Sequence, residues 1–182
     1  MGLFDFFRRK KKAERRNAHT TISIPDDRVD DVIKALGRID TTDYLGKAAA
    51  AGDKARKAIK SGNLDKAWEH YHKQKQLYAG HAKRSEFTPA QALALDGSVS
   101  ESLANVLRLE GKHQEALVHL IYSVATSPRP SKAQEKKITA YFNRAKLSKV
   151  SIEEVERFVE KTRNRPDLRA IQLAIARWGT AK

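Results

Sequence analysis

The sequence predicts an all-α protein, and three observations support this prediction. Apolar residues recur at the spacing of one helix face through most of the chain, polar capping residues precede these segments, and glycine or proline follows them. Only Ile22 and Ile24 alternate in the manner of a strand, and no partner segment could pair with them. We therefore expect helices packed against helices, with no sheet.

The first expected helix spans residues 26–37. It begins at an aspartate cap, carries apolar residues at positions i, i+3, i+4 and i+7 from Val29, and ends at Gly37. An alanine-rich helix and an aromatic one follow, separated by Gly62, and Gly111 ends a later helix. The remaining helices are expected at residues 43–60, 64–79, 88–109, 113–126, 131–146, 151–165 and 167–178.

Polar caps mark the beginnings of several of these helices. One cap is followed by proline at the first helical position, and another forms the capping box Ser-x-x-Glu, in which side chain and backbone bond reciprocally. The same box occurs at Ser98, directly after Asp96 and Gly97, so the helix over residues 88–109 could be interrupted there. The main caps are expected at Thr88, Ser131, Ser151 and Asp167.

The chain repeats part of its pattern at a spacing of 49 residues. Each copy predicts a helix, a glycine turn and a second helix, with a small residue on each helix near the turn. Small residues at these positions let the two helices approach closely. The superposed pairs are Ala55 and Ala104, Gly62 and Gly111, Ala67 and Ala116, and His70 and His119.

The second copy resembles the tetratricopeptide repeat, a helical-hairpin family whose pattern is W-x2-L-G-x2-Y, then A-x3-F, then P, within about 34 residues. This copy departs from the pattern at Ser100, and the first copy departs from it at Lys54 and Ala79. The matching residues are Leu103, Ala104, Leu107, Ala116, Leu120 and Pro128 in the second copy, and Ala55, Ala58, Ala67 and Tyr71 in the first.

The resemblance extends over about residues 42–165, because a shift of 38 residues places a third, weaker helix pair after the second. It implies an antiparallel helical-hairpin repeat of about three helix pairs with flanking helices. The alternative is an ordinary helical bundle in which the alanines agree by chance.

The resemblance also implies a binding surface. In stacked helical hairpins the first helix of each pair lines a concave groove, where side chains meet an extended peptide. Family members that hold the C-terminal carboxylate of a peptide use asparagine, lysine and arginine there. The same positions could instead be solvated residues on surface helices. In this chain they are Arg56, Lys60, Asn105, Arg108, Asn143 and Lys146.

The chain is strongly basic, with 36 Lys and Arg against 22 Asp and Glu and a net charge of +14. A positive charge of this size also favours binding to the phosphate backbone of nucleic acids, so RNA or DNA binding is the alternative function. Against it, the aromatics, such as Tyr141 and Phe142, lie at helical core spacing and do not interleave with the cations as a stacking platform would. The cations that would serve this alternative are Lys132, Lys136, Lys137, Arg144, Lys146 and Lys149.

Residues 1–25 are expected to form a flexible amphipathic and basic tail, and residues 26–182 the helical domain. If the first residues are helical, their apolar side chains share one face, and a basic run follows directly. This pattern favours reversible contact with an anionic membrane, whereas a disordered tail and binding to a partner protein are the alternatives. The residues proposed to contact the membrane are Leu3, Phe4, Phe6, Phe7, Arg8, Arg9 and Lys10.

No combination of residues in the sequence indicates catalysis. Cysteine is absent, and the HExxH, glycine-rich phosphate-loop and GxSxG motifs do not occur. His70 and His72 are two residues apart, so on a helix they point in different directions and cannot hold one metal ion. We therefore expect no enzymatic activity, no cofactor and no metal.

These observations together favour a non-catalytic adaptor that holds another protein through an acidic or C-terminal peptide in a basic groove. Its expected location is the cytoplasm, where the tail could bring it to the inner face of the membrane. A basic helical protein that binds RNA or DNA is the alternative.

Overall fold

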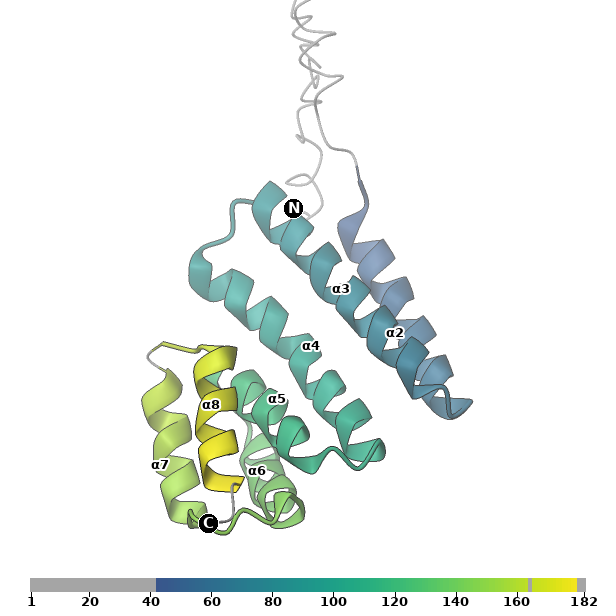
Figure 1. Cartoon of the computed structure of the whole chain (residues 1–182). Helices are drawn as coiled ribbons and strands as arrows, with labels where there is room; N and C mark the ends of the chain where they lie inside the picture. The colour runs from purple at the N-terminus through teal and green to yellow at the C-terminus, as the bar shows by residue number, and fades with distance from the viewer. Residues whose placement is uncertain (1–41, 164, 180–182) are drawn as a thin grey trace, which may run out of the picture. The chain divides into compact units, whose positions relative to one another are not determined.

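The computed structural model describes residues 42–163 and 165–179, and every regular element in these residues is an α-helix (Figure 1). The all-α prediction is thus confirmed for this part of the chain. The chain divides into two units, Met1–Asp40 and Thr41–Lys182, and only the second contains described residues. The helices are α2 (Tyr44–Lys60), α3 (Leu64–Arg84), α4 (Pro89–Leu109), α5 (His113–Thr126), α6 (Lys132–Ala145), α7 (Ile152–Arg163) and α8 (Leu168–Gly179).

The expected caps are present at the helix beginnings. Thr88 and Gln91 form a capping box at the start of α4, with proline at the first helical turn. At α7 the backbone N–H of Ser151 donates to Oε2 of Glu154 at 2.8 Å, and the N–H of Glu154 donates to Oγ of Ser151 at 3.3 Å. Asp167 accepts from the first N–H groups of α8. These bonds satisfy backbone donors that a helix leaves unpaired at its N-terminus.

The two turn glycines end their helices as predicted. Gly62 and Gly111 adopt φ values of 74° and 77°, in the left-handed region. This conformation is roughly 1–2 kcal/mol less favourable for residues with a Cβ, so glycine suits both turns. Helix α3 can therefore turn back alongside α2, and α5 alongside α4.

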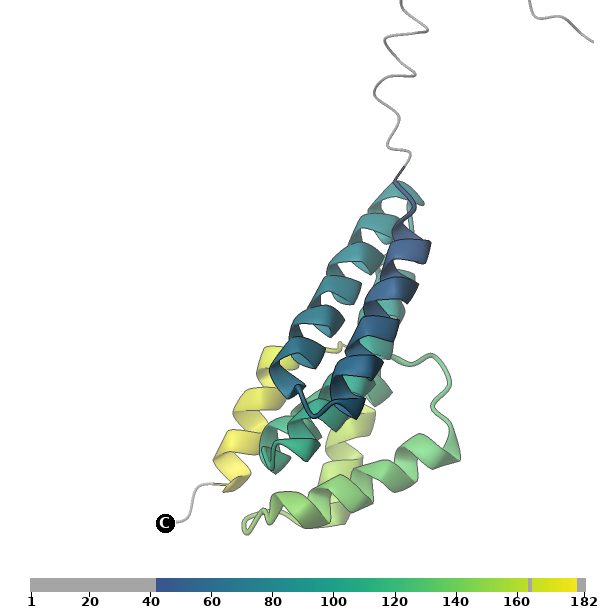
Figure 2. The same cartoon turned by 90° about the vertical axis from the view of Figure 1, so that its right-hand side faces the viewer.

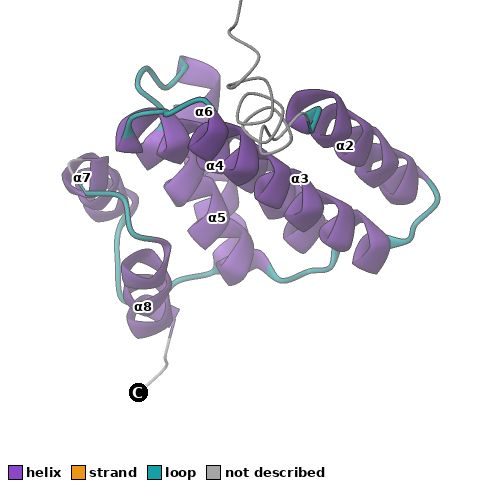
Figure 3. Ribbon diagram, turned by 90° about the horizontal axis from the view of Figure 1, so that it is seen from above, coloured by secondary structure: helices purple, strands orange, loops and turns teal. Residues whose placement is uncertain are grey.

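Neighbouring helices pack side by side, α2 on α3, α3 on α4 and α4 on α5 (Figures 1 and 3). The small residues that the repeat placed near the turns, Ala55, Ala67, Ala104 and Ala116, are all fully buried. Small side chains at these contacts allow helix axes to approach at the short end of the usual 8–10 Å range. The sequence thus predicted where these helices meet.

Helix α5 is the centre of the larger core. Ten of its 14 residues are buried, and it packs against α4, α6, α7 and α8. Figure 2 shows α6 crossing the direction of α2 and α3. The sequence placed α6 and α7 together as a third pair, but each has α5 as its main packing partner. The reason is that Ile138, Val155 and Val159 all join the cluster around α5.

Two glycines inside helices are contact points rather than helix ends. A Cβ at Gly80 would lie 2.4 Å from Cε1 of Tyr44, and a Cβ at Gly97 would lie 1.7 Å from Oγ1 of Thr126. The possible interruption at Gly97 does not occur, because α4 continues through this residue to Leu109, as the uninterrupted alternative predicted. Helix α3 likewise continues past the predicted end at residue 79 to Arg84.

Gly97→Ala is expected to lower the free energy of unfolding by about 1–3 kcal/mol, because the added methyl group must displace buried Thr126. Alanine's better helix propensity, worth about 1 kcal/mol, opposes this loss but does not exceed it. Urea unfolding followed by circular dichroism measures the change, and the exposed neighbour substitution Ser98→Ala is the control. Adding Thr126→Ala should recover part of the loss. A Gly97→Ala protein as stable as the parent would contradict this contact between α4 and α5.

Candidate functional site

A concavity of about 490 Å³ lies between α4 and α6, with Tyr71 of α3 also in its lining. Each of the two helices contributes three polar or aromatic side chains at positions i, i+4 and i+7, which lie on one helix face. The lining residues at this spacing are Glu101, Asn105 and Arg108 of α4, and Lys137, Tyr141 and Arg144 of α6. Two matching stripes therefore face one another across the concavity.

Glu101 connects the two helices that form this concavity. Its Oε1 lies 2.5 Å from Nζ of Lys137, and its Oε2 accepts a hydrogen bond from Nε2 of Gln134 at 3.2 Å. Burial raises the pKa of Glu101, but the bonds from Lys137 and Gln134 outweigh it and leave this pKa below its ordinary value. Glu101 is thus ionised at neutral pH, and α6 compensates its charge.

The two arginines of the concavity are oriented by neighbours on their own helices. Nε and Nη2 of Arg108 donate to Oδ1 of Asn105 at 3.3 and 2.8 Å. Nη1 of Arg144 donates to the carbonyl oxygen of Ala140 at 2.9 Å. Because Lys137 is paired with Glu101, the concavity carries two further positive charges on fixed guanidinium groups.

The structure brings together only two of the six residues predicted to bind a peptide. Asn105 and Arg108 line the concavity, as the predicted register of α4 requires. The other four do not line it: Arg56 is exposed and pairs with Asp53 on α2, Lys60 and Asn143 are exposed, and Lys146 follows α6 in a left-handed conformation.

For Asn143 and Lys146 the source of the difference is the predicted register of α6, whereas Arg56 and Lys60 belong to α2, which contributes no residue to this concavity. Tyr141 and Arg144 occupy the positions that the sequence analysis gave to Asn143 and Lys146, two residues further along the chain. Since each residue turns a helix by about 100°, a shift of two residues moves a side chain to another face. Lys132, Lys136 and Thr139 repeat the same i, i+4, i+7 spacing of polar side chains on another face of α6, so this spacing alone does not identify the face that lines the concavity.

The sequence analysis assigned Lys137 and Arg144 to the alternative, nucleic-acid surface. The structure separates these two from Lys132 and Lys136, which are exposed on α6 outside the concavity. It also places Glu101 in the site, where the sequence analysis considered only its capping role. The proposed membrane-contact residues, in the first ten positions, lie outside the described residues.

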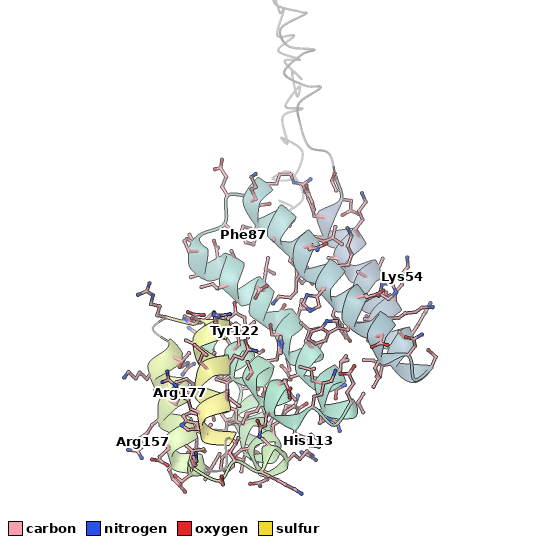
Figure 4. All side chains as sticks on the ribbon, viewed as in Figure 1. Lys54, Phe87, His113, Tyr122, Arg157 and Arg177 are labelled. Atoms are coloured by element: carbon pink, nitrogen blue, oxygen red, sulfur yellow. The ribbon has the colours of Figure 1, made fainter. Side chains whose placement is uncertain are left out.

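A second cluster of polar side chains joins α3, α4 and α5. Nζ of Lys75 lies 2.9 Å from Oδ2 of Asp96 and 3.4 Å from Oγ of Ser100, and it stands 5.6 Å from the ring centre of Tyr122 (labelled in Figure 4). Burial, together with Asp96, raises the pKa of Tyr122. Ser100 is fully buried, so this cluster fixes the alignment of three helices within the core.

His119 lies beside this cluster and is held in its neutral form. Its ring meets Trp68 edge-on at 5.7 Å, and its Nδ1 is buried with no hydrogen-bond partner. Burial lowers the pKa of His119 to about 4, with further contributions from the charges of Lys75 and His72 and a smaller, opposing one from Asp96.

His119→Phe is expected to reduce the loss of stability in acid. The folded pKa of about 4 lies below the ordinary value of 6.5, so the unfolded chain takes up the proton first. Above pH 6.5 the neutral His119 makes its full contribution to the free energy of unfolding. This contribution, up to about 3 kcal/mol, is lost as the pH falls from 6.5 towards 4. Phenylalanine keeps the edge contact with Trp68 but cannot titrate.

Urea unfolding of both proteins between pH 7 and pH 4.5 measures this effect. The difference between the two free energies removes the contributions of the carboxylates, which both proteins share. A difference that stays constant over this pH range would contradict the assignment.

Among the described residues, no group of three or more His, Asp or Glu side chains is arranged to hold a metal ion. Within the same residues, no helix combines the length and the apolar character that a membrane span requires. No protein-family model, curated protein or solved structure matches this chain.

Proposed function

We propose that this chain is a non-catalytic adaptor that binds an acidic peptide segment in the concavity between α4 and α6. The observation that supports the proposal most directly is the convergence of Arg108, Lys137 and Arg144 on one concavity that contains a single carboxylate, Glu101. A volume of about 490 Å³ lies within the range of about 300–1,000 Å³ typical of ligand sites. A short acidic segment fits both this size and this charge.

The arginine side chains of the concavity are held in place by hydrogen bonds before a ligand binds, which also supports the proposal. Arg108 and Arg144 are already oriented by Asn105 and Ala140, so less side-chain entropy is lost when a ligand binds. Tyr141, which is partly exposed in the concavity, adds aromatic surface with a polar end, a combination frequent at protein interfaces.

The nucleic-acid alternative has weaker support from the aromatic side chains. Stacking of bases needs accessible rings, but Tyr71 is 5% exposed and Trp68 is partly buried against His72 and His119. Phosphate contacts alone would rely on the sum of exposed cations, whereas a peptide site would rely on the few oriented in the concavity.

Two asparagines on different helices provide a matched test of the binding site. Asn105→Ala should weaken binding of an acidic peptide about threefold to tenfold, because Arg108 loses the acceptor that orients it, and a hydrogen bond is worth roughly 0.5–1.5 kcal/mol. Asn143→Ala makes the same chemical change outside the concavity and should leave the affinity unchanged. Neither substitution alters the net charge.

The measurement is fluorescence anisotropy with nine-residue peptides rich in Asp and Glu, prepared with free and with amidated C-termini. The two C-termini show whether a terminal carboxylate or an internal acidic side chain is recognised. Equal affinities of the two variants would contradict the site. An RNA or DNA oligonucleotide that binds more tightly than the acidic peptides, with a steep dependence on salt, would favour the alternative function.

We also propose that the N-terminal tail recruits this chain to an anionic membrane surface. Deleting residues 1–16 should abolish binding to vesicles that contain anionic lipid, because seven basic residues are removed at about 1 kcal/mol each near such a surface. The deletion should leave peptide affinity unchanged, since the lining of the concavity comes from α3, α4 and α6. Sedimentation with vesicles measures the first effect. If full-length protein does not bind vesicles with anionic lipid at low salt, membrane recruitment by the tail is excluded.

A further inference from the structure

The charges in the concavity are not equivalent to one another. Lys137 is paired with Glu101 at 2.5 Å, and Gln134 donates to the second oxygen of the same carboxylate. This part of the site is therefore close to neutral. Arg108 and Arg144 are hydrogen-bonded to the neutral acceptors Asn105 Oδ1 and Ala140 O, so their two positive charges remain for a ligand.

Both guanidinium groups also have N–H donors beyond those bonded to Asn105 and Ala140. A guanidinium group has five N–H donors, of which Asn105 accepts from two in Arg108 and Ala140 accepts from one in Arg144. Further donors of both groups can meet the oxygen atoms of a tetrahedral anion. Planar guanidinium groups bind phosphate and carboxylate oxygens in pairs, whereas lysine acts as a single point charge.

We propose that the concavity is a phosphate-binding site whose ligand is a phosphorylated peptide segment. This inference rests on the proposed function and specifies its ligand. A carboxylate side chain compensates only one of the two arginine charges, whereas a phosphorylated Ser, Thr or Tyr carries a charge of about −1.5 to −2 at pH 7 and compensates both. Arg108 and Arg144 bind the phosphate, and Lys137 keeps Glu101 neutralised.

Three matched peptide libraries test the ligand class on the full-length chain. They share the same randomised flanking residues and differ only at the central position, which is Ser, Asp or phosphoserine. We expect the phosphoserine library to bind at least tenfold more tightly than the Asp library at about 150 mM salt, and the Ser library to bind least. Lowering the pH from 7.5 to 5.5 should weaken only the phosphoserine library, because the second pKa of a phosphate is about 6.

Substitutions on α6 and α4 test the assigned residues. Arg108→Gln and Arg144→Gln should each remove most of the preference for phosphoserine over Asp. Lys136→Gln removes the same charge from the same helix as Arg144, but outside the concavity, and should keep the preference. Arg108→Lys retains the charge without the planar donors and should lose most of the preference. Circular dichroism melting confirms that each variant folds.

The outcomes separate this inference from the proposed function. Equal binding of the Asp and phosphoserine libraries would overturn the inference and leave acidic-peptide binding intact. No binding of any library would overturn the proposed function as well. Vesicles with phosphorylated lipid, or a single-stranded RNA oligonucleotide, serve as competitors. If either binds through Arg108 and Arg144 more tightly than the phosphoserine library does, the peptide ligand is wrong.

Discussion

Burial of α5 on all sides is the constraint on which the described structure depends. A helix with apolar residues around its whole circumference must be covered all round, and four neighbours, α4, α6, α7 and α8, provide this cover. Fully buried Leu117, Leu120 and Ile121 are among the largest side chains in this core. The packing of α4 and α6 on α5 in turn holds apart the two faces that form the concavity. The geometry of the candidate site thus follows from the core.

Polar contacts determine how these helices align, and they contribute little to the free energy of unfolding. The Glu101–Lys137 pair is partly exposed, and such pairs contribute under about 1 kcal/mol. Its effect is geometric, since it joins one position of α4 to one position of α6. The cluster around Lys75 acts similarly between α3, α4 and α5, because the partly buried ammonium group of Lys75 is paired with Asp96 of α4 and bonded to Ser100.

The candidate site combines rigid helices with side chains held by short local bonds. Asn105 and Arg108 are three residues apart on α4, so the acceptor that orients the guanidinium group comes from the same helix face. Sites on helices hold their side chains more accurately than sites on loops. Selectivity between anions can then depend on the number and direction of donors and not on net charge alone.

For the described residues, the sequence by itself determined the helices, their caps and the turns at Gly62 and Gly111, because these depend on bonds within a few residues. The helix predicted at residues 26–37 lies outside the described residues. It also predicted that Asn105 and Arg108 share one face of α4, and both line the concavity. The roles of Gly80 and Gly97 were decided only by the tertiary structure, since glycine within a helix gives no local sign of the Tyr44 or Thr126 side chain that packs on it. The rotation of α6 about its axis was likewise decided only by the tertiary structure. Few of its residues are buried, so this rotation depends on the packing against α5 and on the contact with Glu101. Local hydrogen bonding is encoded along the chain, whereas the face that a helix presents depends on which neighbours cover it.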